Sequence, residues 1–193
     1  MNGSRVKALT LLAGSAVLLG GVLSPVQAAG SAQAAYCGQV WGSTPESRAT
    51  TAKNQVLTDV RAGRHACFDR LVVDLGGPAT GASYDVRYVS AVYQVGSGAQ
   101  VPLEGGAALQ IAVRAPAYDE DGDATYTPPN RNRVVDVEGF RTFEQVSWAG
   151  SYEGRTTLGV GTRARLPFRT FTVLGANGSD DAARLVIDVG HAW

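Results

Sequence analysis

Histidine and lysine are scarce in this sequence, and their scarcity narrows the chemistry open to the chain. It has two histidines, His65 and His191, and two lysines, Lys7 and Lys53. A catalytic zinc site normally takes three protein ligands, often two or three of them histidines, and no His-Glu-x-x-His spacing occurs. We therefore predict structural or surface roles for both histidines, and no metal site.

Motifs of nucleophilic catalysis and of nucleotide binding are also missing. The serine motif Gly-x-Ser-x-Gly and the phosphate-binding loop do not occur, and Gly159-Val-Gly161 lacks the rest of a dinucleotide fingerprint. Carboxylate pairs that cleave glycosides are assembled in space, so Glu138, Glu144 and Glu153 stay open as candidates for a hydrolase. No feature of the sequence favours them. We predict no catalytic residue, no cofactor and no enzymatic activity.

Long apolar runs are absent except near the start, where the pattern is that of an export signal. Arg5 and Lys7 precede an apolar stretch at residues 8–23, and Val26-Gln-Ala28 then offers the small residues that a signal peptidase recognises. The apolar stretch is shorter than the roughly 20 residues of a membrane-spanning helix. We predict a signal peptide at residues 1–28 and no membrane anchor after its cleavage; a retained anchor is the alternative.

The charges of the rest of the chain are balanced. Removal of Arg5 and Lys7 leaves 15 basic and 17 acidic residues. Without a basic patch, nucleic acid and anionic membranes are not expected partners.

Cysteine occurs twice, as Cys37 and Cys67. In the oxidising compartment that an exported protein reaches, two cysteines at this separation predict a disulfide. A reactive thiol is the alternative, but no His/Asn context for a cysteine nucleophile stands out. The bridge would tether an N-terminal extension, residues 29–55, to a domain at residues 56–193.

That domain shows strand patterns and no convincing long amphipathic helix. In residues 67–75, Leu71, Val73 and Leu75 share one face of the predicted strand. Val72 is an apolar residue on the other face, which indicates that solvent reaches that face only in part. About nine short strands with turn signals between them predict an all-β fold, a β-sandwich of two mostly antiparallel sheets. The predicted strands are residues 56–61, 67–75, 84–89, 91–95, 107–115, 142–148, 155–161, 168–174 and 184–189. Ordered structure is also expected at residues 134–137.

One strand pattern occurs twice. Arg70-Leu-Val-Val-Asp74 is repeated near the end of the chain as Arg184-Leu-Val-Ile-Asp188. Two related halves and chance similarity between two ordinary strands are both open explanations.

We expect the long irregular stretch at residues 117–132 to be either functional or simply mobile. Asp119, Asp121 and Asp123 resemble the start of a calcium loop, but the glycine is misplaced and Asn130 stands where a bidentate Glu should close the site. We therefore expect a solvated acidic loop.

Aromatic side chains could stack on sugar rings if they are exposed. Trp148 is expected in the core. Tyr118, Tyr126 and Tyr152 are better placed than Trp148 for a surface role, but we expect them to be ordinary loop tyrosines.

Several segments carry a resemblance to a known family. They are the opening Cys37-Gly with Trp41-Gly-Ser, His65-Ala-Cys-Phe-Asp-Arg, Tyr84-Asp-Val-Arg-Tyr-Val, Gly139-Phe-Arg-Thr-Phe-Glu, Leu166-Pro-Phe-Arg and Arg184-Leu-Val-Ile-Asp-Val. In these the chain resembles the AMIN-like domain family of actinobacterial exported proteins. The resemblance implies a β-sandwich related to the AMIN modules of cell-wall amidases, which are non-catalytic and direct proteins to the cell envelope.

The resemblance implies no particular binding residue, and the sequence singles out none. We expect a secreted, extracellular, non-catalytic binding module that associates with the cell envelope. Its expected partner is peptidoglycan, another cell-wall glycan or an envelope protein. A secreted protein–protein interaction module is the alternative, and a hydrolase with a spatially assembled site is less favoured.

Overall fold

The fold is described by a computed structural model, which covers residues 37–176, 179 and 182–193. The predicted signal peptide, residues 1–28, lies outside the described residues. The regular structure of the described part consists of eleven strands without a helix, so none of these residues forms a helix that could cross a membrane. The predicted all-β class is confirmed.

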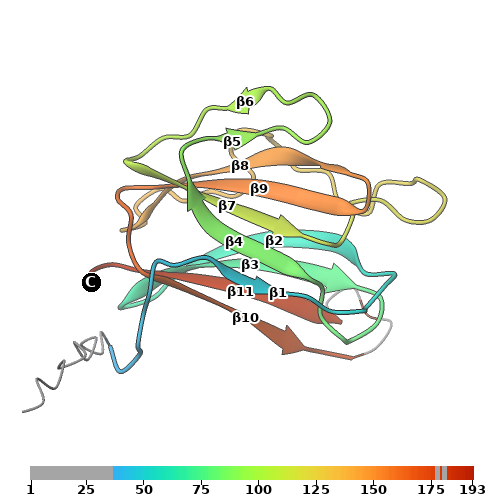
Figure 1. Cartoon of the computed structure of the whole chain (residues 1–193), viewed down its shortest axis with the longest axis horizontal. Helices are drawn as coiled ribbons and strands as arrows, with labels where there is room; N and C mark the ends of the chain where they lie inside the picture. The colour runs from blue at the N-terminus through green and yellow to red at the C-terminus, as the bar shows by residue number, and fades with distance from the viewer. Residues whose placement is uncertain (1–36, 177–178, 180–181) are drawn as a thin grey trace, which may run out of the picture. The chain divides into compact units, whose positions relative to one another are not determined.

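Nine of the strands form two antiparallel sheets (Figure 1). The five-stranded sheet has the order β1-β4-β7-β9-β8, and the four-stranded sheet has the order β10-β11-β3-β2. The bounds in the first sheet are β1 Glu46–Arg48, β4 Tyr84–Val89, β7 Ala107–Val113, β8 Phe143–Tyr152 and β9 Arg155–Thr162. Those in the second are β2 Val56–Arg64, β3 Phe68–Gly76, β10 Phe168–Leu174 and β11 Ala183–Gly190.

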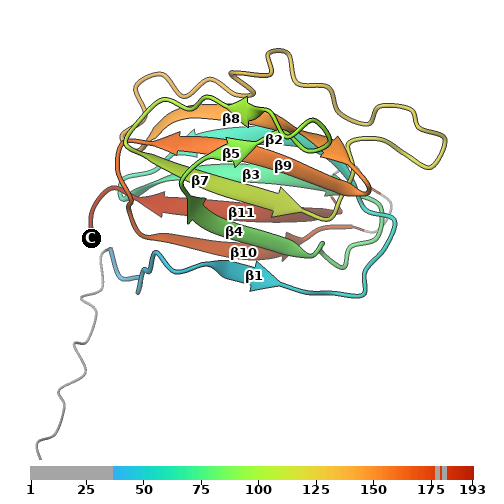
Figure 2. The ribbon, with the colours of Figure 1, turned by 45° about the horizontal axis from the view of Figure 1, so that its top comes forward.

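The two sheets pack face to face and enclose the core (Figure 2). Leu71, Val73 and Leu75 of β3 point inward and are fully buried, as their alternation predicts. From the other sheet, Leu109 and Ile111 of β7 join the same apolar cluster. The β-sandwich is therefore confirmed, and its core is built from the period-2 pattern of both sheets.

A small hairpin covers the outer face of the five-stranded sheet. It consists of β5 (Val92–Tyr93) and β6 (Gln100–Val101), and Val92 packs on Ala149 of β8. Glycine in β9 permits this close approach, because a Cβ atom on Gly159 would stand only 3.3 Å from the side chain of Val92.

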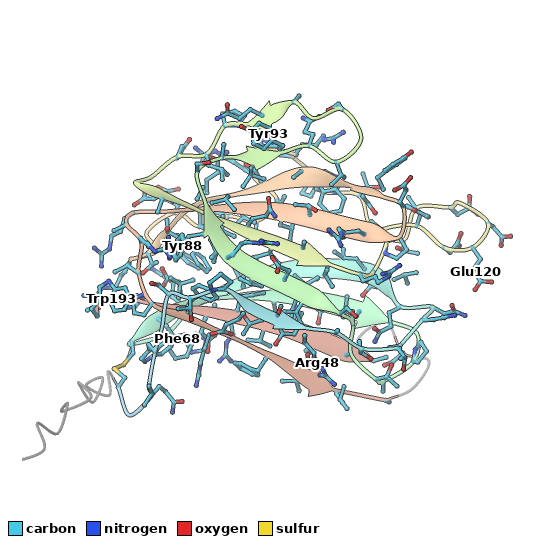
Figure 3. All side chains as sticks on the ribbon, in the orientation of Figure 1. Arg48, Phe68, Tyr88, Tyr93, Glu120 and Trp193 are labelled. Carbon is cyan, nitrogen blue, oxygen red and sulfur yellow. A yellow bond between two sulfur atoms is a disulfide. The ribbon has the colours of Figure 1, made fainter. Side chains whose placement is uncertain are left out.

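The segment before β2 is held to the sandwich by a disulfide, by strand pairing and by hydrogen bonds. The predicted disulfide joins Cys37 to Cys67, with Cα atoms 6.2 Å apart (Figure 3). Gly42 accepts a hydrogen bond from the Phe168 amide, and β1 pairs with β4. Residues 37–55 thus contribute a strand to the five-stranded sheet in addition to their disulfide.

The strand boundaries differ from prediction in several places. β1 and β6 were not predicted, the strand expected at residues 91–95 is reduced to β5, and β8 continues to Tyr152. Residues 134–137, where ordered structure was expected, form no strand. There Val134 and Val137 are buried, and the Val134 amide donates to Val146 of β8 at 2.8 Å. The apolar pattern in this segment reflects contact with the core rather than pairing within a sheet.

Candidate functional site

The repeated pattern places arginine opposite aspartate on the outer face of the four-stranded sheet. β3 and β11 are antiparallel neighbours, and their register sets Arg70 against Asp188 and Asp74 against Arg184. Because the two copies of the motif run in opposite directions, the arginine of each copy meets the aspartate of the other. We call this surface, with Arg61 and Arg169 from the flanking strands, the arginine face.

Each aspartate of the arginine face is held by two arginines. Arg70 donates to Asp188 at 2.6 and 2.9 Å, and Arg169 donates to the same carboxylate at 2.9 Å. Arg61 donates to Asp74 at 2.5 and 2.7 Å, and Arg184 lies 3.3 Å from it. The hydrogen bonds to Asp188 raise the pKa of Arg70 above its ordinary value. The negative charges are therefore buried under guanidinium groups.

Aromatic rings fill the space between these guanidinium groups. Arg169 lies over the rings of Trp41, Phe68 and Phe171 at 5.0, 5.5 and 5.3 Å. Arg70 lies over Phe68 and Phe171 at 5.1 and 5.6 Å. The stack connects β3 and β10 with Trp41 of the segment before β2, so we assign it first to the stability of the sheet.

A concave site lies at the opposite end of the sandwich from Phe68, where β8 turns into β9. Tyr126, Trp148 and Tyr152 line a pocket of about 350 Å³ together with Pro128, Ser151 and Arg131. We call it the aromatic pocket. Figure 3 marks this end of the molecule by Glu120, in the loop that carries Tyr126.

The three rings of the aromatic pocket differ in exposure to solvent. Trp148 is 7% exposed and belongs to the core cluster, as predicted, yet it also lines the pocket. Tyr126 is half-buried, with its ring centroid 5.7 Å from that of Trp148. Tyr152, at the rim, is 55% exposed. The three rings therefore form a wall that reaches from the interior to the surface.

Hydrogen bonds fasten the long loop that forms one side of the pocket. The Ala117 amide donates to the Ser151 hydroxyl at 2.9 Å, and the Thr125 hydroxyl donates to the carbonyl of Leu57 at 2.7 Å. The Trp148 amide donates to the carbonyl of Arg131 at 2.7 Å. These bonds tie residues 117–131 to β2 and β8, so the position of Tyr126 beside Trp148 is set by the fold.

The phenol of Tyr126 stays protonated across the neutral range. Burial, and second the negative charge of Asp59, raise the pKa of Tyr126 to about 12. Asp59 itself lies 3.9 Å from the guanidinium of Arg61. Tyr126 can therefore donate a hydrogen bond to a ligand.

The acidic loop is organised by its own backbone. One oxygen of Asp119 accepts hydrogen bonds from the amides of Asp121 and Asp123 at 3.0 and 2.9 Å. In the part of the chain that the structure describes, no group of three or more His, Cys, Asp or Glu is arranged to hold a metal ion.

The two histidines have different surroundings. His65 is exposed and stacks on Phe68 with a centroid distance of 4.5 Å. His191 is buried, and its Nε2 lies 3.1 Å from Asp69, whose other oxygen accepts the amides of Thr142 and Phe143. His191 is thus part of a buried polar network that joins the ends of β11, β3 and β8.

The carboxylates considered for glycoside cleavage do not share an element. Glu138 lies in the loop before β8, Glu144 on β8 and Glu153 in the turn between β8 and β9. All three are exposed. None of them lies in the apolar pocket that a catalytic carboxylic acid normally occupies.

A larger groove of about 680 Å³ adjoins the same loop. Lys53, Arg114, Asp119 and Glu120 line it, so its charge is mixed. Tyr118 is its one aromatic lining residue, and its hydroxyl accepts the Gly154 amide at 3.1 Å. The aromatic pocket differs from this groove, because three rings line it and none of its lining residues is acidic.

The sequence indicated some of the aromatic pocket and missed the rest. Tyr126 and Tyr152 were considered for a surface role but expected to be ordinary loop tyrosines, and the fold brings them together beside Trp148. Arg131 was not singled out, because no local spacing connects a loop arginine to a strand tryptophan.

One of three comparisons with known proteins finds a match. The model of the AMIN-like domain family matches residues 55–191. The search of curated proteins finds no match, and neither does the search of solved structures.

Proposed function

The chain belongs to the AMIN-like domain family, and we propose that it is an exported, non-catalytic module that binds a glycan of the cell wall. Family membership suggests a binding module of the kind associated with cell-wall amidases. The identity of the ligand as a wall glycan and the position of its binding site are what we propose in addition.

The aromatic pocket is the observation that carries this proposal. Aromatic rings pack against the apolar C–H faces of sugar rings, while a few polar groups around them orient the hydroxyls. The pocket offers both, since the rings of Tyr126, Trp148 and Tyr152 stand beside the Tyr126 phenol and Arg131. Its volume of about 350 Å³ matches a small ligand or one segment of a polymer.

The proposal is tested by sedimentation with purified, insoluble cell wall. The mature protein should appear in the pellet, and Tyr152→Ala should bind about tenfold more weakly, the effect of losing about 1.4 kcal/mol. Tyr93→Ala is the matched control. Tyr93 is 52% exposed, much like Tyr152, but it lies on the β5–β6 hairpin and does not line the aromatic pocket. Protein that stays entirely in the supernatant would contradict the proposal, as would equal losses in both variants.

A protein–protein interaction module is the second candidate, and the arginine face favours it. Arginine and aromatic residues are enriched among the residues that dominate protein interfaces. Crosslinking of culture supernatant that captures a defined complex, lost in Phe171→Ala but kept in Tyr152→Ala, would favour this function over glycan binding.

A further inference from the structure

Arg131 occupies a fixed place at the aromatic pocket. Its carbonyl accepts the Trp148 amide at 2.7 Å, and the next turn is closed by the Asn130 side chain, which accepts the Asn132 amide at 2.9 Å. The backbone of Arg131 is therefore pinned to the edge of β8, although its side chain is exposed.

The guanidinium of Arg131 is available to a ligand. It makes no hydrogen bond or ion pair with any residue that the structure describes. Arg133, two residues later in the same loop, donates instead to Glu104 at 2.9 Å. Of these two neighbouring exposed arginines, Arg133 is therefore engaged away from the pocket and Arg131 lies at its rim.

The residues that line the aromatic pocket carry one positive charge. Arg131 is the one charged residue among those that line the pocket in the described part of the chain, and none of these lining residues is acidic. The neighbouring groove differs, because Asp119 and Glu120 offset Lys53 and Arg114 there. A planar guanidinium matches a carboxylate through two parallel hydrogen bonds.

We infer that the aromatic pocket is selective for a sugar that carries a free carboxylate, with Arg131 binding that group and the tyrosines packing on the ring. This inference rests on the proposed function and specifies its ligand. Arg131 determines specificity, while the aromatic side chains supply binding that does not depend on charge.

The inferred ligand has a place in a reaction sequence. In the bacterial wall, peptides are joined to the glycan through an amide of a sugar carboxylate. Hydrolysis of that amide adds water, releases the amino group of the peptide and leaves the carboxylate on the sugar. The ligand is therefore a product of amide hydrolysis, namely glycan from which peptides have been removed.

The test compares soluble glycan strands in three forms, measured by calorimetry with the mature protein. They are strands with peptides, strands freed of peptides, and freed strands whose carboxylates have been converted to primary amides. The free-carboxylate form should bind about tenfold more tightly than the other two, and added salt should reduce this advantage. A polymer of glucuronic acid, as a further arm, distinguishes a general preference for sugar carboxylates from one for wall strands.

Variants separate the two parts of the inference. Arg131→Gln should lose the preference for the carboxylate and keep the weaker binding of the amidated strands, whereas Tyr152→Ala should weaken binding of every form. Arg133→Gln is the matched control and should behave as wild type. Equal affinity for the free and amidated strands, or an unchanged preference in Arg131→Gln, overturns this inference alone. Absence of binding to all three forms overturns the proposed function with it.

Discussion

Arg70 and Asp188 are 118 residues apart in the chain, yet the guanidinium of one donates to both carboxylate oxygens of the other. The Asp188 side chain is fully buried, while the Arg70 side chain remains 27% exposed. Arg169 holds the same carboxylate from the other side. The repeated motif therefore has a structural consequence, because it joins β3 and β11 through charge as well as through backbone pairing.

Replacement of Asp188 by Ala should destabilise the protein strongly. It leaves Arg70 and Arg169 without the carboxylate that compensates them, over a part of the sheet that solvent reaches poorly. We expect a loss of about 2–4 kcal/mol in the free energy of unfolding, measured by urea titration. Asp85→Ala is the control, because Asp85 binds Arg87 at the same 2.6 Å but both side chains are substantially exposed. It should cost at most about 1 kcal/mol, and similar losses in the two variants would refute a special role for the buried pair.

The core faces could be predicted from the sequence because they follow from alternation within single strands, as in residues 67–75. Features that are assembled from segments far apart in the chain could not be predicted in this way. The polar strand β1 exists because it pairs with β4 and because Glu46 accepts the Thr170 amide at 2.6 Å. The same holds for the aromatic pocket, since Tyr126 reaches Trp148 only when the loop is fastened to β2 and β8. No local pattern records those contacts.

A charge introduced into the core should prevent folding. Leu71 and Val73 are fully buried, so Leu71→Asp or Val73→Asp places a carboxylate among apolar side chains. The cost of several kcal/mol for an unpaired buried charge approaches a total stability of about 5–15 kcal/mol. Circular dichroism should show loss of the sheet signal. Val173→Asp, at a position of β10 that is 39% exposed, should fold and melt close to wild type. A core variant that melted like wild type would contradict the assigned faces.

Loss of the disulfide should lower stability without changing the sandwich core. The bridge closes a loop with a sequence separation of 30 residues, for which the chain-entropy model gives about 3–4 kcal/mol. We expect the double variant Cys37→Ser, Cys67→Ser to lose about this amount in urea titration, and wild type under reducing conditions to behave in the same way. Two free thiols in the native protein, detected by a thiol assay, would disprove the bridge.

Stability at alkaline pH should depend on Tyr126. Its pKa is about 12 in the folded protein, against about 10 in an unfolded chain. Because the raised pKa favours the neutral phenol in the fold, the contribution to stability is complete below pH 10 and is lost as the pH rises toward 12. Burial also raises the pKa values of Tyr84 and Tyr88, so Tyr126→Phe should remove only part of the fall in Tm between pH 10 and 12. Tyrosinate absorbance should show one fewer group titrating near pH 12 in this variant, with Tyr93→Phe as the surface control. An unchanged absorbance curve near pH 12 would mean that the Tyr126 phenol is open to solvent, and the wall of the aromatic pocket would then lie differently from the arrangement described.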